Sequence, residues 1–211
     1  MRVPWWGRGL LLGGAVSAAL GVTSVVVRRP LPTPTAALVG DAVWAPGAVP
    51  APEIALRDQR GRVVRLSALR GRVVAVTFMD SRCTTDCPVE GAVLAALQRR
   101  LGPAAPLTLL VVSTDPGGDT PARARAFARR YGWTGPWDWL LGSRRQLAPV
   151  WRAYHVRVQS ADGHSDAIYL VGPGGDERAA FGFPYSVPLL LADVRALSRH
   201  RTVGWTWPLG G

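Results

Sequence analysis

Residues 73–88 read VVAVTFMDSRCTTDCP, an apolar run that leads directly into two cysteines. Val73–Met79 is β-branched or apolar throughout, which is typical of a central strand that is buried on both faces. Beyond Cys83 and Cys87, apolar residues recur at helical spacing over residues 89–101, and a glycine then ends the pattern. This stretch therefore predicts a buried strand, a short loop that carries the cysteines, and a helix.

Strands and helices are predicted to alternate along the rest of the chain. Before the quoted stretch, Ile54–Leu56 and Val63–Leu66 flank a polar turn and predict a hairpin. After it, Pro121 is expected at the first position of a helix, with Asp119 or Thr120 as the N-cap. The expected strands span 107–112, 167–171 and 178–183, and the expected helices span 122–132, 143–154 and 187–200.

This alternation is typical of an α/β sandwich, in which helices cover the faces of a sheet. We therefore predict a thioredoxin-like domain at residues 51–200, with a central mixed, largely parallel sheet and a terminal hairpin. We expect this domain to be monomeric. The C-terminal tail at 201–211 contains two tryptophans and no periodicity, so it predicts no further element.

The N-terminal segment predicts attachment to a membrane. Residues 9–27 carry no charge, and at ~1.5 Å per residue they are long enough for a transmembrane helix across a bilayer core of ~30 Å. Trp5 and Trp6 stand where an interfacial aromatic belt would lie. We expect a cytoplasmic N-terminus at 1–8, a single transmembrane anchor at 9–27 in a bacterial cell membrane, and a proline-rich linker at 28–50. A cleaved signal sequence is the alternative, and either reading places the domain outside the cytoplasm.

Charge and composition exclude several classes of protein. The chain has 25 basic and 14 acidic side chains, and every basic one is arginine. A chain without lysine or asparagine points to a GC-rich genome, so the net charge of +11 is weak evidence for a polyanionic partner. The arginines are scattered, and we expect no nucleic-acid partner. A hydrophobic content of 48% excludes disorder, and two cysteines are too few for a disulfide framework.

Cys83 and Cys87 carry the chemistry that the sequence predicts. Four-residue spacing at the start of a helix brings both sulfur atoms to one face, within reach of a disulfide or of one metal ion. The helix dipole and the neighbouring Arg82 favour a reactive thiolate. Two thiolates suit Cu(I), and with one imidazole they also hold Cu(II). A purely structural Cys83–Cys87 disulfide is the alternative, but a corner between strand and helix is a common place for ligand and redox sites.

Three histidines are candidates for the imidazole. His164 lies in a polar loop immediately before a predicted strand, His155 follows a predicted helix, and His200 belongs to the last helix. Position in the sequence does not choose among them. A structural zinc site is disfavoured, because zinc usually takes four ligands and the chain has only two cysteines and three histidines.

Three motifs together resemble the Sco/SenC family of copper-binding, thioredoxin-like proteins. They are FMDSRCTTDCP at 78–88, VSTDPGGDTP at 112–121 and HSDAIYLVGPG at 164–174. The resemblance covers residues 50–200 and implies that Cys83 and Cys87 are thiolate ligands of copper, as Cu(I) or Cu(II), with His164 as the imidazole ligand. It also implies a membrane anchor and a role in assembling the copper centre of cytochrome c oxidase.

The chain departs from the family pattern near these ligands. Gly163 precedes His164 where many members have aspartate, and Asp162 stands one position further away. Thr84 follows the first cysteine where proline is more frequent. Asp115 and Asp119 match the family's loop, but a turn and a helix cap explain these two residues without any function.

Two classes of function follow from these residues. The first is a metallochaperone that binds copper and passes it to, or reduces the cysteines of, the copper-bearing subunit of cytochrome c oxidase or another copper protein. The second is a thiol-disulfide oxidoreductase that uses Cys83 and Cys87 without obligatory copper. Redox thioredoxins usually have two residues between their cysteines and a proline before the facing strand. Here the spacing is three and residues 164–167 contain no proline, which favours the metal site.

Overall fold

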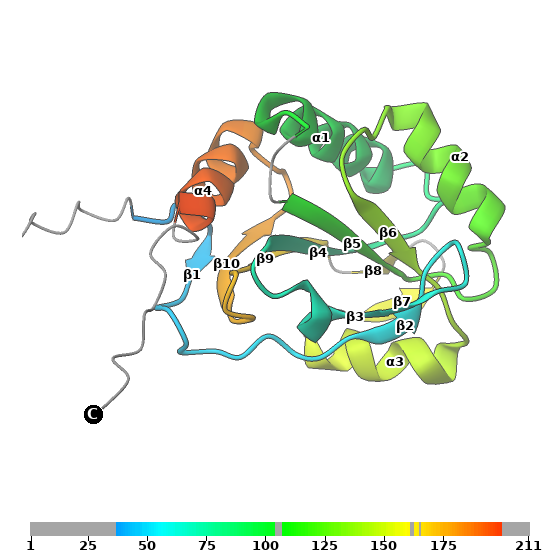
Figure 1. Cartoon of the computed structure of the whole chain (residues 1–211). Coiled ribbons are helices and arrows are strands. Elements are labelled where there is room, and N and C mark those ends of the chain that lie inside the picture. The colour runs from blue at the N-terminus through cyan, green and yellow to red at the C-terminus, as the bar shows by residue number, and fades with distance from the viewer. Residues whose placement is uncertain (1–36, 104–106, 161–162, 165, 200–211) are drawn as a thin grey trace, which may run out of the picture. The chain divides into compact units, whose positions relative to one another are not determined.

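The computed structural model describes residues 37–103, 107–160, 163–164 and 166–199. Within these ranges a six-stranded sheet is flanked by helices on both faces (Figure 1). The strands of this sheet are β1 (Ala42–Val43), β4 (Val73–Met79), β5 (Leu107–Ser113), β6 (Trp137–Leu140), β9 (Ala167–Val171) and β10 (Glu177–Gly182). The helices are α1 (Asp86–Leu101), α2 (Pro121–Tyr131), α3 (Arg144–Ala153) and α4 (Val187–Arg199), with a 3-10 turn at Leu66–Leu69. Two hairpins stand apart from the sheet: β2 (Ala55–Arg57) with β3 (Val63–Arg65), and β7 (Val158–Ser160) with β8 (Gly163–His164).

The strand order of the sheet is β1-β10-β9-β4-β5-β6. Strand β4 pairs in parallel with β5, and β5 with β6, whereas β4–β9, β9–β10 and β10–β1 are antiparallel. The mixed α/β sandwich is confirmed, but the prediction of a largely parallel sheet is wrong for the described chain. The reason is that the β9–β10 hairpin and β1 extend one side of β4 with antiparallel strands, so parallel pairing is limited to the other side.

Strand β4 separates two layers of core. Its seven residues are all buried, and successive side chains point to opposite faces. Val73, Ala75 and Met79 pack with residues of α1, α2 and α4, whereas Val76 and Phe78 pack with α3 and the β2–β3 hairpin. Figure 1 shows α1, α2 and α4 together above the sheet and α3 below it. Burial on both faces explains why the sequence of β4 is apolar without alternation.

The contact between α1 and α2 depends on Gly91. A Cβ atom at this position would lie 2.7 Å from Cε1 of Phe127 and 3.0 Å from Cδ2 of Tyr131. Gly91→Ala is expected to lower the free energy of unfolding by about 1 kcal/mol, because overpacking costs about 1–3 kcal/mol and alanine regains about 1 kcal/mol in helix propensity. Urea denaturation measures the change. Gly117→Ala is the control, since its nearest neighbour would be 3.8 Å away. Equal stability of the two variants would contradict the prediction.

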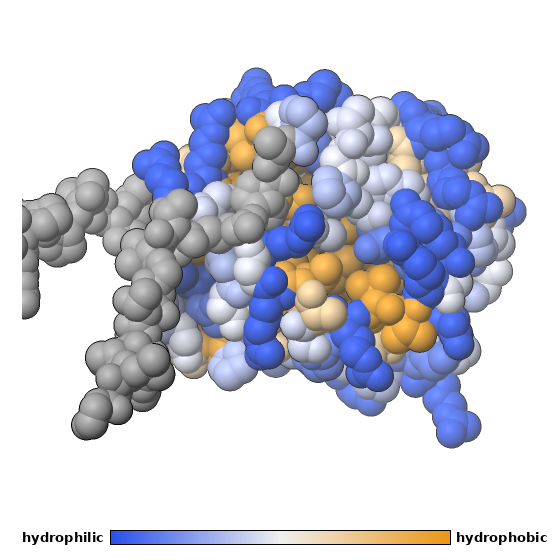
Figure 2. Space-filling model, viewed as in Figure 1, coloured by the Kyte–Doolittle hydropathy of each residue, from blue (hydrophilic) through white to orange (hydrophobic). Residues whose placement is uncertain are grey.

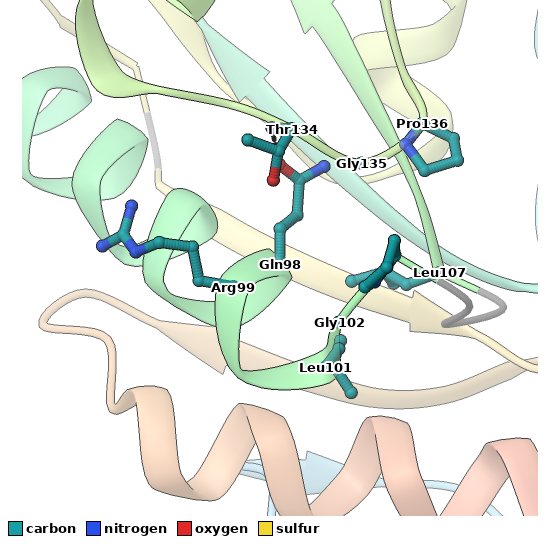
Figure 3. A pocket seen from close by; sticks show the side chains of 9 residues that line it. Gln98, Arg99, Leu101, Gly102, Leu107, Thr134, Gly135 and Pro136 are labelled. Atoms are coloured by element: carbon teal, nitrogen blue, oxygen red, sulfur yellow. Dashed lines mark hydrogen bonds between the residues drawn. The ribbon is translucent and has the colours of Figure 1, made fainter.

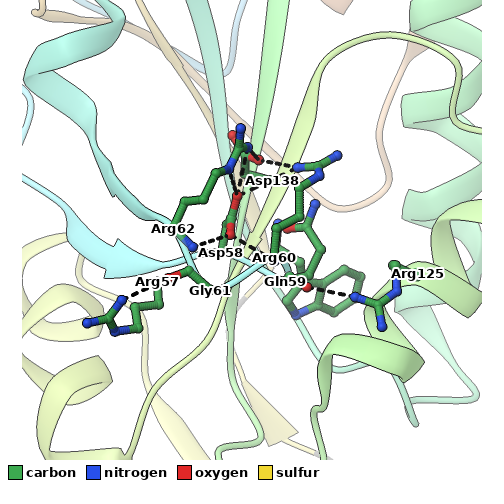
Figure 4. A network of polar contacts seen from close by, with 9 residues as sticks. Arg57, Asp58, Gln59, Arg60, Gly61, Arg62, Arg125 and Asp138 are labelled. Carbon is green, nitrogen blue, oxygen red and sulfur yellow. Dashed lines mark hydrogen bonds and ion pairs between the residues drawn. The ribbon is translucent and has the colours of Figure 1, made fainter.

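A buried carboxylate holds the turn of the β2–β3 hairpin (Figure 4). Asp58 is 2% exposed, and its Oδ1 accepts hydrogen bonds of 2.8 Å from the backbone N–H groups of Arg60 and Arg62. The guanidinium of Arg62 donates to Oδ2 at 2.9 Å, and Arg60 and Arg62 also pair with Asp138 on β6. Burial alone would raise the pKa of Asp58, but the hydrogen bonds from Arg62 and Arg60 outweigh it and lower the pKa below 3.8. The hairpin is thereby attached to the edge of the sheet.

Asp58→Asn is expected to destabilise the protein in a pH-dependent way. The folded-state pKa lies below the ordinary value of 3.8, so the ionised carboxylate contributes stability above pH 3.8 and loses it as the pH falls through the folded-state pKa. At pH 7 we expect a loss of about 1.5–3 kcal/mol, which is the range for hydrogen bonds to charged groups. Denaturation of both proteins between pH 7 and pH 2 checks this. If the difference in unfolding free energy between the two proteins stayed constant down to pH 2, the ionised carboxylate of Asp58 would not be its source.

The predicted strands and helices of the domain are confirmed to within a few residues. The domain also begins earlier than the expected boundary at residue 51, because β1 pairs with Ala179 and Ala180 of β10. In addition, the N–H groups of Val39 and Gly40 donate to the carboxylate of Asp193 on α4, at 2.8 and 3.1 Å. The last part of the expected linker is therefore attached to the domain.

No helix in the described ranges is long and apolar enough to cross a membrane. The expected N-terminus at 1–8, the expected anchor at 9–27 and the tail at 201–211 lie outside these ranges. On the face that Figure 2 shows, hydrophilic side chains are spread between apolar areas rather than gathered in one place.

Candidate metal centre

The two cysteines lie where strand β4 gives way to helix α1. Cys83 is in the connecting loop and partly exposed, whereas Cys87 is in the first turn of α1 and 0% exposed. Both are free thiols. The loop turns at Asp80, whose carbonyl accepts from the N–H of Cys83 at 3.2 Å and whose side chain accepts from the N–H of Arg82 at 2.7 Å. The N–H of Asp80 in turn donates to Sγ of Cys87 at 3.5 Å. One short loop therefore positions both sulfur atoms.

A second loop, between β5 and α2, holds the cysteine loop in place. The carboxylate of Asp119 accepts from the N–H of Ser81 at 2.9 Å, from the hydroxyl of Ser113 at 2.5 Å and from the indole N–H of Trp139 at 3.3 Å. Nε of Arg82 donates to Asp115 at 2.7 Å, and the same two side chains form an ion pair. Since β4 and β5 are parallel neighbours, the loops that follow them lie at the same edge of the sheet.

This arrangement changes the explanation of the two aspartates. The N-cap of α2 is Thr120, whose Oγ1 accepts from the N–H of Arg123 at 3.2 Å, so Asp119 does not cap the helix but holds the cysteine loop. The turn predicted at Asp115 is confirmed, because its Oδ1 accepts from the N–H groups of Gly117 and Gly118 at 3.2 and 2.9 Å. Both aspartates therefore contribute to the geometry of the site.

The two thiols have opposite acidities. Partial burial on its own would raise the pKa of Cys83, but hydrogen bonds from Thr85 and Cys87 outweigh it and lower the pKa below 9.0. The hydroxyl of Thr85 lies 3.4 Å from Sγ of Cys83. Burial raises the pKa of Cys87 far above its ordinary value. Arg82, which the sequence suggested as a source of positive charge for the thiolate, pairs with Asp115 instead. Cys83 is therefore the more acidic and the more accessible of the two thiols, whereas Cys87 keeps its proton until the sulfur binds a metal ion or joins a disulfide.

Iodoacetamide is expected to alkylate Cys83 well before Cys87, at a rate that rises with pH through a pKa below 9.0. Thr85→Val removes a hydrogen bond to the thiolate. The pKa of Cys83 should therefore rise in this variant, and a rise of half a unit would slow alkylation near pH 7 roughly threefold. Mass spectrometry of the labelled peptides measures both effects, and Thr84→Val at the exposed neighbouring position is the control. Equal labelling of the two cysteines would contradict the assignment.

The third predicted ligand, His164, is in β8, paired with Val158 of β7. The next strand, β9, is antiparallel to β4, so its first residues lie beside the end of β4 that leads to the cysteines. A hydrogen bond of 3.3 Å from the hydroxyl of Thr77 to the carbonyl of Ala167 joins the two strands there. The backbone thus places Ala167, the first residue of β9, at the same edge of the sheet as the loop that carries Cys83.

The histidine side chain itself lies outside the described part of the structure, so the three-ligand set stays a prediction. In the described ranges no three Cys, His, Asp or Glu side chains gather closely enough to hold a metal ion. His155 is exposed, in a left-handed conformation (φ 56°) after α3. His200 lies outside the described residues.

Sequence reasoning did not single out Glu90, which is buried on α1 three residues after Cys87. This residue is 1% exposed and accepts a hydrogen bond from the hydroxyl of Thr77. The available signal was its position three residues after Cys87, because residues at this spacing share one face of a helix.

A cavity of about 300 Å³ lies at the other end of α1, near Gln98, Leu107 and Pro136 (Figure 3). The side-chain oxygen of Gln98 accepts from the N–H of Thr134 at 3.1 Å. Because Cys87 is in the first turn of α1 and Gln98 in its last turns, this cavity is separate from the cysteine site.

Two curated proteins of known families are similar to this chain in sequence. The SCO1 protein homolog of Bacillus subtilis (strain 168) is 28% identical over 155 residues, which are 67% of this chain and 79% of that protein. The mitochondrial SCO2 homolog of Bos taurus is 31% identical over 140 residues, which are 58% of this chain and 50% of that protein.

Solved structures share the fold. BsSco, described as a member of the Sco family of cytochrome c oxidase assembly proteins with a disulfide switch, has a TM-score of 0.64 at 24% identity, over 74% of this chain and 98% of that one. ScoI of Bradyrhizobium japonicum, solved with copper bound, has a TM-score of 0.57 at 25% identity, over 71% of this chain and 99% of that one. The family model for SCO1/SenC proteins matches residues 49–199, and the chain therefore belongs to the SCO1/SenC family.

Proposed function

We propose that this protein binds copper through Cys83, Cys87 and His164 and serves in the assembly of the copper centre of cytochrome c oxidase. The observation that carries the proposal is a pair of cysteines, Cys83 and Cys87, on a loop that Asp115 and Asp119 hold in place, in a chain that the SCO1/SenC model matches. The donor set fits copper: two thiolates suit Cu(I), and an added imidazole accommodates Cu(II). Support also comes from a relative of the same fold, ScoI of Bradyrhizobium japonicum, which was solved with copper bound.

The exposure of the two cysteines suggests how copper enters and leaves. Cys83 is partly exposed and is the more acidic of the two thiols, so it is the first group to meet a copper ion or a partner's ligand. Cys87 is buried, and copper binding must displace its thiol proton. Release by ligand exchange then begins at Cys83, where a ligand of the partner replaces the exposed sulfur before the buried one.

The cellular setting is part of the proposal. We place the domain on the extracytoplasmic side of a bacterial cell membrane, held by a single anchor at residues 9–27. The sequence supports this location through the uncharged run of 9–27 and the tryptophans that precede it. The partner would be the copper-bearing subunit of cytochrome c oxidase or another copper protein.

The acidities of the two thiols also favour a second function, reduction of a partner's disulfide. The Cys83 thiolate would attack one sulfur of that disulfide and release the other as a thiolate. Cys87, after losing its proton, would then attack the sulfur of Cys83 and release the partner's second thiolate. Two electrons pass to the partner, and a Cys83–Cys87 disulfide remains. The structure of BsSco, described by its disulfide switch, supports this alternative.

A deletion strain distinguishes the two functions. If the protein delivers copper, the oxidase isolated from the strain should lack copper, and added copper or the wild-type gene should restore it. The double variant Cys83→Ser, Cys87→Ser should not restore it. A fully loaded oxidase together with disulfide defects in other exported proteins would favour the oxidoreductase.

A further inference from the structure

Helices α1 and α4 both run away from the edge of the sheet that carries the cysteines. Helix α1 follows the end of β4 that leads to the cysteines, and α4 follows β10, whose last residue, Gly182, pairs with Ala167 at the same edge. The two helices pack side by side above the sheet (Figure 1). With 16 residues α1 is ~24 Å long, so its far end is well separated from the candidate metal centre.

Arginines gather at the far ends of these two helices. Arg99 and Arg100 lie in the last turn of α1, and the guanidinium of Arg195 on α4 donates to the carbonyl of Arg100 at 3.3 Å. All three residues are exposed, and the described structure pairs none of them with a carboxylate. Arg72 is exposed at the same edge of the sheet, directly before β4. Folding therefore brings arginines from three parts of the sequence to one end of the domain, the basic end (Arg72, Arg99, Arg100 and Arg195).

Exposed carboxylates lie elsewhere on the domain. Among the described residues, only Asp41 and Glu53 are exposed acids. The carboxylate of Asp41 accepts from the N–H of Gly182 at 2.8 Å, at the cysteine edge, and that of Glu53 accepts from the N–H of Ser67 at 3.4 Å, in the 3-10 turn. Positive charge at the end of a helix stabilises that helix, but a group of exposed arginines without acidic neighbours also attracts anions from the surroundings.

In the proposed location a membrane lies within reach of this end. The N–H groups of Val39 and Gly40 are bonded to Asp193, two residues before Arg195, so the N-terminal part of the chain joins the domain on α4. Residues 28–39, which connect this point to the expected anchor, span at most ~40 Å. The anchor would therefore hold the domain close to the bilayer, with the attachment point on the same helix as Arg195.

The sequence after α4 adds an aromatic component. Residues 201–211 continue from the helix that carries Arg195, and they contain Trp205 and Trp207. Tryptophan is enriched where a bilayer meets water, because its ring is amphipathic. Basic side chains together with tryptophan are typical of protein surfaces that bind anionic membranes.

We propose that the basic end binds the anionic phospholipid headgroups of the membrane to which the chain is attached. This inference rests on the proposed location of the protein at a membrane. With the basic end on the bilayer, the cysteine edge is directed away from the membrane, at a distance of about the length of α1, where a partner's extracytoplasmic domain can reach Cys83. Each arginine at an anionic surface strengthens binding about fivefold.

Protection of arginines from phenylglyoxal, a reagent that modifies arginine, tests the proposal. The full-length chain is reconstituted in vesicles of phosphatidylcholine with or without one-third phosphatidylglycerol, and mass spectrometry measures the modification of each arginine. We expect Arg99, Arg100 and Arg195 to react roughly fivefold more slowly in the anionic vesicles. Arg145 and Arg152 are exposed reference positions on α3, which covers the other face of the sheet, and should react equally in both. At about 1 M salt, where the screening length is ~3 Å, the protection should disappear.

Two matched double variants test whether charge at the basic end is the cause. Arg99→Gln with Arg100→Gln removes two charges from this end, so the reaction rate of Arg195 in anionic vesicles should rise toward its rate in pure phosphatidylcholine. Arg145→Gln with Arg152→Gln removes two charges from α3 and should leave the protection of Arg195 unchanged. Equal reaction of the basic end in both kinds of vesicle would overturn the inference, and so would equal slowing at Arg145 and Arg152.

Flotation of the vesicles separates failure of this inference from failure of the proposed location. If the full-length chain floats with neither kind of vesicle, the proposed membrane location is wrong and the inference falls with it. If the chain floats with both and its arginines react equally in both, the inference alone is wrong.

Discussion

Replacement of Cys87 by serine is expected to lower copper affinity by about three orders of magnitude. Structural zinc sites with four ligands bind with ~10–16 kcal/mol, so one ligand contributes about 2.5–4 kcal/mol, and each 1.4 kcal/mol is about tenfold in affinity. The loss of binding free energy should lie at the upper end of this range, because a serine hydroxyl is a hard, protonated donor and copper prefers thiolate. The fold should survive, since serine is nearly the size of cysteine and can still accept from the N–H of Asp80.

A competition titration against a chelator of known affinity measures this loss. Thr84→Ala is the matched control, because this exposed residue lies in the same loop and should leave affinity within twofold of the wild type. A Cys87→Ser variant that retains the wild-type affinity would show that the buried sulfur is not a ligand. The pair would then be better explained as a redox couple.

His164→Ala is expected to lower copper affinity by about a hundredfold and to change the thiolate-to-copper absorption. An imidazole contributes less than a thiolate to a soft ion, so the effect should be smaller than that of Cys87→Ser and larger for Cu(II) than for Cu(I). His155→Ala is the control, because His155 is exposed after α3 and lies outside the three motifs that resemble the family.

The same titration, with spectra recorded at each point, checks this prediction. Unchanged affinity and absorption in His164→Ala would show that the three-ligand set is wrong. A loss in His155→Ala instead would identify that histidine as the ligand.

Local sequence patterns predicted most of the fold. Val73–Met79 was found as a strand with these bounds because burial on both faces leaves a continuous apolar run. Short strands carried no such signal: Trp137–Leu140 has four residues without alternation, and Ala42–Val43 has two, in a segment rich in proline. The direction of β9 depends on pairing with a distant strand, which explains why a largely parallel sheet was expected.

The cysteines were predicted from their motif, whereas their surroundings were not. Asp119 and Ser81 are far apart in the sequence and meet only because β4 and β5 are parallel neighbours. From the sequence alone, the simplest explanation for Asp119 was therefore that it caps the N-terminus of the following helix. Glu90 was missed for the same kind of reason, since it is bonded to Thr77 and Tyr185, which are distant from it in the sequence. Local patterns identify residues that carry chemistry, and long-range contacts determine how these residues are held.

X-ray absorption at the copper edge of the loaded, full-length chain tests the central claim most directly, because it counts the atoms bound to the metal. We predict two sulfur neighbours, from Cys83 and Cys87, and an imidazole nitrogen that is lost in His164→Ala. A spectrum with only oxygen and nitrogen neighbours would contradict copper binding by the cysteine pair.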